Sequence, residues 1–314
     1  MKSDVVGCTV QQEEKKNKNI ISSAYPSSSS LHWTEKSIPG LTITTAFAIW
    51  LLITTIFIPA LIQKYYYYCN NGDDDSSTSN CTNNGGLLPL PPINVLGWSI
   101  LFFNNLNVLI ALCEISLGNN IDFIRNDYQN LIKEYRSPKT GGKPIKAEYL
   151  AGFAYLNTPL CLKDIYDGGQ TWSRMWSTYS LWDPSYSNPE SFGFFIDVGN
   201  GWSTILPCWL WNFAILLPHQ FTPNNNNSNN NDSPNMAVVL LGFIGACSYW
   251  QVLYGTIIYF LSFCWNKRYK NKPLAEVLGF VGFANGIWFF FPIACLWASY
   301  KVLLDRDPKS LFWY

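Results

Sequence analysis

The sequence predicts an all-α, polytopic membrane protein, a bundle of five transmembrane helices around an intramembrane cavity. Charged residues are only 13% of the 314 residues, against roughly 25% in soluble domains. Apolar residues gather in five blocks, each long enough, at roughly 20 residues, to cross about 30 Å of hydrocarbon. Two acids, Glu114 and Asp197, lie inside blocks, where an unpaired charge costs roughly 3 kcal/mol on insertion scales. These acids predict the cavity.

Helices are the expected form of the blocks. Within a bilayer only helices and closed barrels satisfy every backbone polar group. The blocks do not alternate apolar and polar residues, as barrel strands would. The near-zero mean hydropathy of +0.02 averages these apolar blocks with very polar, Asn- and Ser-rich segments.

Composition also argues against several partners. The formal net charge is zero, which argues against nucleic acid. The nine cysteines form no CxxC or Cys/His ligand pattern, and His32 and His219 are the only histidines, so neither a metal nor a cofactor is predicted. Cys69 and Cys81 share one polar loop. They are either a disulfide in an oxidising lumen or two free thiols.

The first 92 residues divide into a tail, a helix and a loop. Residues 1–40 are polar and are expected to be disordered. No apolar segment follows the first lysine, so no secretory signal is predicted and targeting falls to the first membrane helix. Residues 41–92 hold that helix, at about 43–62, then an aromatic belt at 65–68 and an Asn/Asp/Ser-rich loop.

Residues 93–303 form the predicted membrane domain, and 304–314 a C-terminal tail. Its four helices are expected at about 93–117, 192–217, 236–263 and 274–303. The connection 118–191 contains an amphipathic helix, expected on the membrane surface, whose apolar residues recur at helical spacing: Ile121, Ile124, Tyr128, Leu131, Ile132 and Tyr135. Pro138, Gly141 and Gly142 end it.

Two features of the sequence indicate which side of the membrane each loop faces. The N-terminal tail, the long connection and the loop 266–273 hold 17 of the 21 Lys and Arg residues. The positive-inside rule then places the N-terminus in the cytosol and the C-terminus in the lumen. Two Asn-rich loops on the predicted lumenal side contain sequons at Asn80, Asn226 and Asn231. These are either glycosylation sites or chance products of Asn-rich composition.

Four of the helices carry polar stripes. Asn107 and Glu114 are seven residues apart and share a helix face. Asp197 is followed by Asn200, Gly201 and Thr204, the fourth membrane helix offers Gln251 and Tyr254, and the fifth offers Asn285 and Trp288. Hydrogen bonding between helices, at about 0.6 kcal/mol each, is the simpler explanation of such stripes. Two acids exceed what packing needs and favour a ligand or catalytic cavity, whereas Gln251 and Asn200 fit either role.

Four segments of the chain carry distinctive motifs: LNVLIALCE, MWSTYSLWDPSY, QVLYGTIIYFL and FANGIWFFFP. Together they resemble the emopamil-binding, or EXPERA, family of endoplasmic-reticulum membrane proteins. LNVLIALCE resembles the family segment that ends in an intramembrane acid, here Glu114. MWSTYSLWDPSY resembles its W-x-x-Y…D-x-x-Y signature, carried by Trp176, Tyr179, Asp183 and Tyr186. QVLYGTIIYFL resembles its Q-x-Y-G pattern with one extra residue, and FANGIWFFFP resembles its N-x-x-W…P pattern. The spacing after Asp183 places Asp197 at the family's second intramembrane acid.

The resemblance implies a multi-pass protein of the endoplasmic reticulum that shifts a sterol double bond from Δ8 to Δ7. Glu114 would donate the proton, and Asp197 would stabilise the carbocation and act as base. Substrate-binding roles would fall to Asn107, Trp176, Tyr179, Gln251, Tyr254, Asn285 and Trp288. Trp288 would lie against the cation, Asn285 would orient a carboxyl group, and Trp176 and Tyr179 would line the entrance. Its partners would be a sterol or another apolar polycyclic ligand, cationic amphiphiles, the bilayer and a second copy of the chain.

Two departures from the family pattern leave an alternative open. The isomerases carry a histidine one turn before the first acid, where this chain has Ile110, and their second acid is glutamate rather than Asp197. Proton supply would then depend on Asn107, Tyr254 or water. The alternative is a non-catalytic protein that binds a sterol or a cationic amphiphile. A small-solute transporter is disfavoured because no inverted repeat is visible.

Overall fold

A computed structural model describes residues 37–70, 93–136, 147–161, 163–164, 169–221 and 236–313. Within these residues the chain is all-α, and two isolated bridges, Thr42–Pro159 and Ile93–Trp313, are the only β pairings. Several predictions concern residues outside these ranges: the tail up to residue 36, both Asn-rich loops with their three sequons, Cys81 as the possible partner of Cys69, and the helix breakers Pro138, Gly141 and Gly142.

Four helical segments are long and apolar enough to cross a membrane: Ile43–Tyr65, Val95–Asn119, Met236–Trp265 and Leu274–Asp305. The first comprises α2 (Ile43–Leu52), the π-helix η2 (Ile53–Phe57) and part of α3 (Ile58–Asn70). The second and third are α4 (Val95–Asn119) and α10 (Met236–Trp265). The last joins α11 (Leu274–Glu276), the π-helix η6 (Val277–Phe283) and α12 (Ala284–Asp305). Four of the five predicted membrane helices are thereby confirmed as candidate spans.

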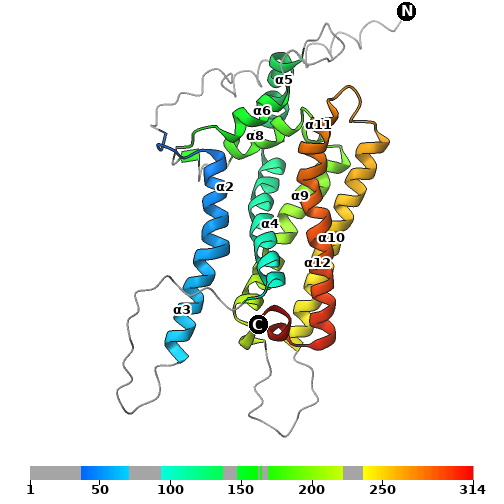
Figure 1. Ribbon diagram of the computed structural model, residues 1–314. Coiled ribbons are helices and arrows are strands. Elements are labelled where there is room, and N and C mark those ends of the chain that lie inside the picture. The colour runs from blue at the N-terminus through cyan, green and yellow to red at the C-terminus, as the bar shows by residue number, and fades with distance from the viewer. Residues whose placement is uncertain are drawn as a thin grey trace, which may run out of the picture.

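The remaining predicted block is the 25-residue helix α9 (Phe192–Leu216), which begins where Ser191 accepts a hydrogen bond from the Phe194 amide. It is not among the four candidate spans, because polar residues such as Asp197 and Asn212 dilute its hydropathy. Even so, α9 packs antiparallel along α4 (Figure 1). At Gly201 the two backbones are so close that a Cβ atom would lie 2.9 Å from the Ala111 carbonyl oxygen.

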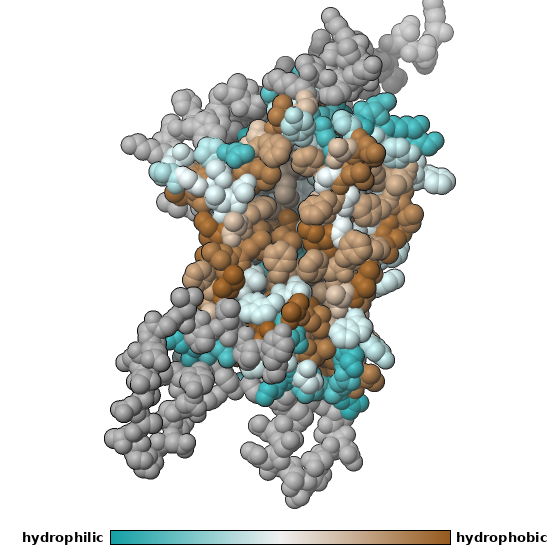
Figure 2. Space-filling model, viewed as in Figure 1, coloured by the Kyte–Doolittle hydropathy of each residue, from teal (hydrophilic) through white to brown (hydrophobic). Residues whose placement is uncertain are grey.

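Figure 1 shows α4, α9, α10 and α12 side by side, with α2 and α3 standing apart. Figure 2 shows an apolar band around the middle of the visible face and hydrophilic residues at both ends. Large apolar side chains are exposed on several helices, among them Trp202, Leu206, Phe243 and Phe290. Exposed apolar surface of this extent is typical of helices that face lipid. Together with the four spans it indicates a multi-pass membrane protein.

Short helices cross one end of the bundle and form what we term the cap (Figure 1). It comprises α5 (Ile121–Tyr135), α6 (Tyr149–Leu156), α8 (Gln170–Tyr179) and the 3₁₀ helix η4 (Pro184–Ser187). The amphipathic helix predicted in the long connection is confirmed as α5, which buries Ile124 and Tyr128. The opposite end carries the 3₁₀ helix η5 (Pro218–Gln220) and α13 (Pro308–Phe312).

A chain of amide side chains joins the helices in the half of the bundle away from the cap. The Tyr249 hydroxyl donates to Asn104 at 3.0 Å, and the Asn104 amide donates to Asn212 at 3.0 Å. Asn212 donates to Asn105 at 2.9 Å, and Asn105 donates to Thr55 at 3.2 Å. The chain connects α10, α4, α9 and η2. It identifies these polar residues of α4 as interhelical contacts rather than site residues.

Charged side chains tie the cap to the loop between α10 and α11. Arg136 hydrogen-bonds to Glu148, and the Lys272 ammonium lies 3.6 Å from the same carboxylate. Arg268 pairs with the fully buried Asp183 at 3.1 Å. These contacts join α5, α6 and the α8–η4 turn to the α10–α11 loop, so they hold the cap against the bundle.

Stability should depend on pH through Lys272. Burial lowers the pKa of Lys272 from 10.5 to about 8, and a lysine that is harder to protonate when folded destabilises the protein while charged. This penalty is full below pH 8 and is lost as pH rises toward 10.5. The unfolding free energy of the wild type should therefore gain about 3 kcal/mol over that interval relative to Lys272→Met. Thermal unfolding in detergent measures it, and parallel pH curves for the two proteins would contradict it.

Candidate functional site

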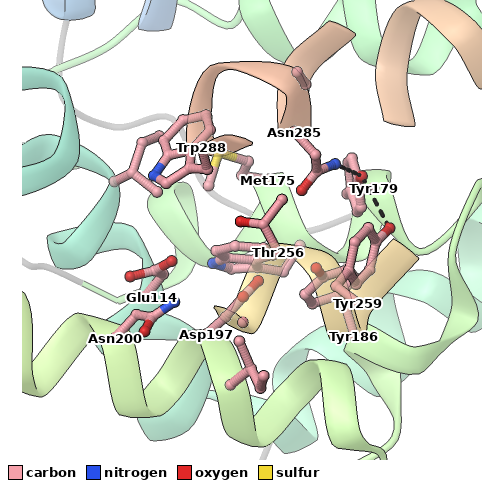
Figure 3. A pocket seen from close by; sticks show the side chains of 15 residues that line it. Glu114, Met175, Tyr179, Tyr186, Asp197, Asn200, Thr256, Tyr259, Asn285 and Trp288 are labelled. Carbon is pink, nitrogen blue, oxygen red and sulfur yellow. Dashed lines mark hydrogen bonds between the residues drawn. The ribbon is translucent and has the colours of Figure 1, made fainter. Parts of the chain in front are cut away.

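A cavity of about 170 Å³ lies between the bundle and the cap. Its walls come from α4, α8, η4, α9, α10 and α12, segments far apart in the sequence (Figure 3). Six of the nine predicted site residues line it: Glu114, Trp176, Tyr179, Asp197, Asn285 and Trp288. Asn107, Gln251 and Tyr254 do not. The fold thus brings both acids to one cavity.

Glu114 is deeply buried but incompletely hydrogen-bonded. Its side chain is 5% exposed, and its Oε2 atom has no hydrogen-bond partner among the described residues. Close packing explains the burial, because the Cβ of any residue replacing Gly201 on α9 would lie 2.8 Å from the Glu114 Cβ. A buried acceptor without a partner is costly and marks a position where a ligand or water can supply the missing bond.

Asp197 lies on α9 and lines the cavity together with Tyr186 of η4. Figure 3 shows Asp197 between Glu114 and Asn200 on one side and the three tyrosines Tyr179, Tyr186 and Tyr259 on the other. The two carboxyl groups therefore share one cavity, with three tyrosine side chains on the Asp197 side.

Asn285 was predicted to orient a carboxyl group, but the partners of its amide nitrogen are a tyrosine hydroxyl and a backbone carbonyl. Its amide nitrogen donates to the Tyr179 hydroxyl at 2.8 Å and to the Val281 carbonyl at 2.9 Å. The Tyr179 hydroxyl in turn lies 3.3 Å from that of Tyr259 (Figure 3). The sequence shows which residues share a helix face, but not which neighbour from another helix is nearest.

Asn107 positions an aromatic wall of the cavity. The Trp288 indole donates to the Asn107 side-chain oxygen at 3.0 Å. The Asn107 nitrogen lies 3.3 Å from the Cys208 sulfur. Asn107 is therefore a buried support of Trp288, and neither of these contacts connects it to Glu114 as a proton route would.

Trp176 lies inside the protein, whereas the sequence analysis placed it at the entrance of the cavity. It is 6% exposed, and its indole nitrogen donates to the Cys113 carbonyl at 2.7 Å. Its ring centroid is 5.0 Å from that of Tyr186. Trp176 and the hydrogen-bonded Tyr179 both belong to α8, so the cap closes this end of the cavity with aromatic side chains.

Gln251 and Tyr254 lie outside the cavity. Gln251 is exposed and donates to Asn200 at 3.0 Å and to Ser203 at 2.6 Å. Tyr254 is 49% exposed, and its ring lies 6.1 Å from that of Trp250. Tyr254 therefore cannot supply protons to the acids directly, and Gln251 acts only through Asn200, which does line the cavity.

The sequence-based site omitted several residues of the cavity wall: Ile110, Met175, Tyr186, Ile196, Asn200, Gly255, Thr256, Tyr259 and Ala284. Some carried a signal. Tyr186 stands in the aromatic signature, Tyr259 lies on the polar stripe of α10, and Thr256 precedes it by three residues on the same face. Ile110 lies one turn before Glu114. The volume of the cavity, about 170 Å³, is also smaller than the roughly 300–1,000 Å³ of sites for drug-sized ligands, so the cavity by itself would enclose only part of a ligand of that size.

Metal-ligating side chains do not cluster: among the described residues no group of three or more His, Cys, Asp or Glu could hold a metal ion. Comparisons of the chain with models of protein families, with curated proteins and with solved structures find no match. The fold and the site define a class, a multi-pass helical membrane protein with a two-carboxyl cavity.

Proposed function

We propose that this protein is a membrane-embedded isomerase that moves a ring double bond of a sterol, from Δ8 to Δ7. The observation that carries the proposal is the pair of carboxyl groups, Glu114 and Asp197, in one apolar cavity beside the indole of Trp288. Double-bond migration needs an acid at one carbon, a base at a neighbouring carbon and stabilisation of the cation between them. Motif resemblance to the EXPERA family supports the same reaction.

Each wall of the cavity would have a role. Glu114, whose Oε2 has no partner, would protonate the alkene. Asp197 would face the carbocation and remove the neighbouring proton. The Trp288 ring, fixed by Asn107, would stabilise the positive charge through its face. In each cycle the sterol gains one proton from Glu114 and loses one to Asp197, so the reaction needs no cofactor. The proton on Asp197 would then return to Glu114 within the cavity.

Membrane placement follows from the same proposal. Helix α9 would cross the bilayer with the four candidate spans, giving five transmembrane helices, because Asp197 and Asn200 line the cavity and Asn212 hydrogen-bonds to α4. The cap and the loop 266–273 would lie on the cytosolic side of the endoplasmic reticulum membrane, where the positive-inside rule places most of the lysines and arginines. Use of a glycosylation sequon in microsomes would test this orientation.

A non-catalytic binding protein is the second candidate, and one observation favours it. Ile110 lines the cavity one turn from Glu114, at the position where the family's isomerases carry a histidine. The acids without that histidine would suit a cationic amphiphile, whose ammonium group would supply the donor that Glu114 Oε2 lacks.

Sterol composition in a yeast strain that lacks its own sterol isomerase separates the two candidates. If the chain is an isomerase, its expression should convert accumulated Δ8 sterols to Δ7 sterols, and Glu114→Gln should abolish the conversion. A chain that reaches the membrane, binds an amine radioligand and yet converts no sterol would contradict the isomerase and support the binding protein.

A further inference from the structure

The loop between α10 and α11 points its cations in two directions. Arg268 and Lys272 turn inward, where each meets a carboxylate at the start of a cap helix. Lys267 and Lys270 are exposed, and neither forms an ion pair with a described residue. The segment 265–275 contains no acid that could neutralise them locally. Two cations of the loop thus hold the cap in place, and two face outward with their charge uncompensated.

A single turn brings the two outward lysines together. The Lys270 amide donates to the Lys267 carbonyl at 3.0 Å, and a four-residue turn closed in this way keeps its end Cα atoms within about 7 Å of each other. Arg268 lies inside the turn and pairs with Asp183 at 3.1 Å. Because this ion pair fixes the turn to the cap, the two exposed ammonium groups are held close enough to contact one phosphate group.

Aromatic side chains place the turn at the level of the lipid headgroups. Trp265, the last residue of the candidate span α10, is 86% exposed, and Tyr269 within the turn is 44% exposed. Tryptophan and tyrosine concentrate where hydrocarbon meets water. Figure 1 shows the α10–α11 loop at the cap end of the bundle, on the side away from α2, and Figure 2 shows hydrophilic residues beyond the apolar band at that end.

We propose that the turn 267–270, together with Trp265, binds the headgroup of an anionic phospholipid. Lys267 and Lys270 would contact the phosphate, and the Trp265 ring would lie beside the upper part of the acyl chains. Basic residues next to a membrane attract anionic lipids over about a Debye length. The inference does not rest on the proposed isomerase. It agrees with a cytosolic cap, because anionic lipids are enriched in the cytosolic leaflet.

Lipid retention tests the proposal. The protein is reconstituted into vesicles of equal parts phosphatidylcholine and phosphatidylserine and extracted in mild detergent, and its bound lipids are counted by native mass spectrometry. The wild type should retain phosphatidylserine in excess, and high salt should reduce the excess. In Lys267→Asn/Lys270→Gln the ratio of the two lipids should fall by a factor on the order of 10. Asparagine is chosen because Lys267 has a φ of +53°, which asparagine tolerates.

A matched control removes the same charge at the opposite end of the bundle. Lys301 pairs with Asp305 at 2.7 Å, and Lys309 lies on α13. Lys301→Gln/Lys309→Gln should keep the wild-type ratio, as should Lys267→Arg/Lys270→Arg, which retains both charges. Equal losses in the two neutralised variants would show that net charge attracts the lipid, and would overturn the proposal.

Two further variants separate the contributions of charge and ring. Trp265→Ala should weaken retention of both lipids without changing the salt dependence. Should Lys267→Asn/Lys270→Gln fold poorly in neutral vesicles, Lys270→Gln alone should still lower the ratio by a factor of about 3. A wild-type ratio in Lys270→Gln would then overturn the proposal.

Inorganic phosphate distinguishes a lipid headgroup from a soluble anion. Added during extraction, it should displace phosphatidylserine no better than chloride does at equal ionic strength, because the lipid is also held by its acyl chains beside Trp265. If phosphate displaces the lipid more effectively than chloride, the turn is a site for a soluble phosphate group and the assignment to a phospholipid fails.

Discussion

Replacement of Asp197 by asparagine is expected to reduce sterol isomerisation by at least a factor on the order of 100, the size typical of a lost general base. The substitution keeps the shape of the side chain but removes the charge that would face the carbocation in the proposed reaction. Binding of a neutral sterol should change little, so the loss should appear in turnover rather than in affinity. Conversion rates per folded protein, measured in membranes, provide the comparison.

Asp127→Asn is a suitable control for that experiment. Asp127 is as buried as Glu114, at 6% exposed, but it accepts a hydrogen bond from Ser177 at 2.6 Å within the cap. Loss of the Asp127 carboxylate should lower the stability of the protein without lowering the turnover per folded molecule. Undiminished conversion by Asp197→Asn would exclude Asp197 as the base, whatever the fate of the control.

Gly201→Ala is expected to destabilise the protein by about 1 to 3 kcal/mol, the usual cost of overpacking a tight contact. The added methyl group would lie 2.8 Å from the Glu114 Cβ and 2.9 Å from the Ala111 carbonyl oxygen. Since one of these neighbours is backbone, α9 must move away from α4. That movement also separates the two acids, so isomerisation and amine binding should both fall.

Gly199→Ala is the matched control on the same helix. A Cβ at Gly199 meets nothing within 4 Å, and alanine favours a helix over glycine by up to about 1 kcal/mol. This variant should therefore be as stable as the wild type or more so, with unchanged activity. Thermal unfolding in detergent compares the pair, and equal melting temperatures for both variants would show that the α4–α9 contact is not tight.

Apolar blocks were the reliable signal for the helices. The blocks expected at about 93–117 and 236–263 appear as Val95–Asn119 and Met236–Trp265, since a run of apolar residues bounded by polar loops permits few other arrangements. The amphipathic spacing in the long connection likewise predicted α5. Helix α9 is the instructive case: its position was predicted, although polar residues keep it out of the four most apolar spans.

Assignment of individual polar residues was less reliable. Asn107 was expected in the cavity because it shares a face with Glu114, but the indole of Trp288 occupies its side-chain oxygen. Tyr254 was expected there because it is polar and lies on a membrane helix, yet it is half exposed on the outside of α10. Spacing along one helix says which residues point the same way; it does not say toward which neighbour they point.

The sequence by itself determined the class of protein, the approximate bounds of its helices and the two acids that are candidate site residues. It could do so because hydrophobic runs and isolated charges are local features of the chain. Only the tertiary structure decided that both acids line one cavity and that Glu114 Oε2 has no hydrogen-bond partner among the described residues. Burial of Glu114 depends on the close approach of α4 and α9 at Gly201, and the ion pair of Asp183 with Arg268 holds the cap against the bundle. These contacts join residues distant in sequence, and their geometry follows from how the helices pack.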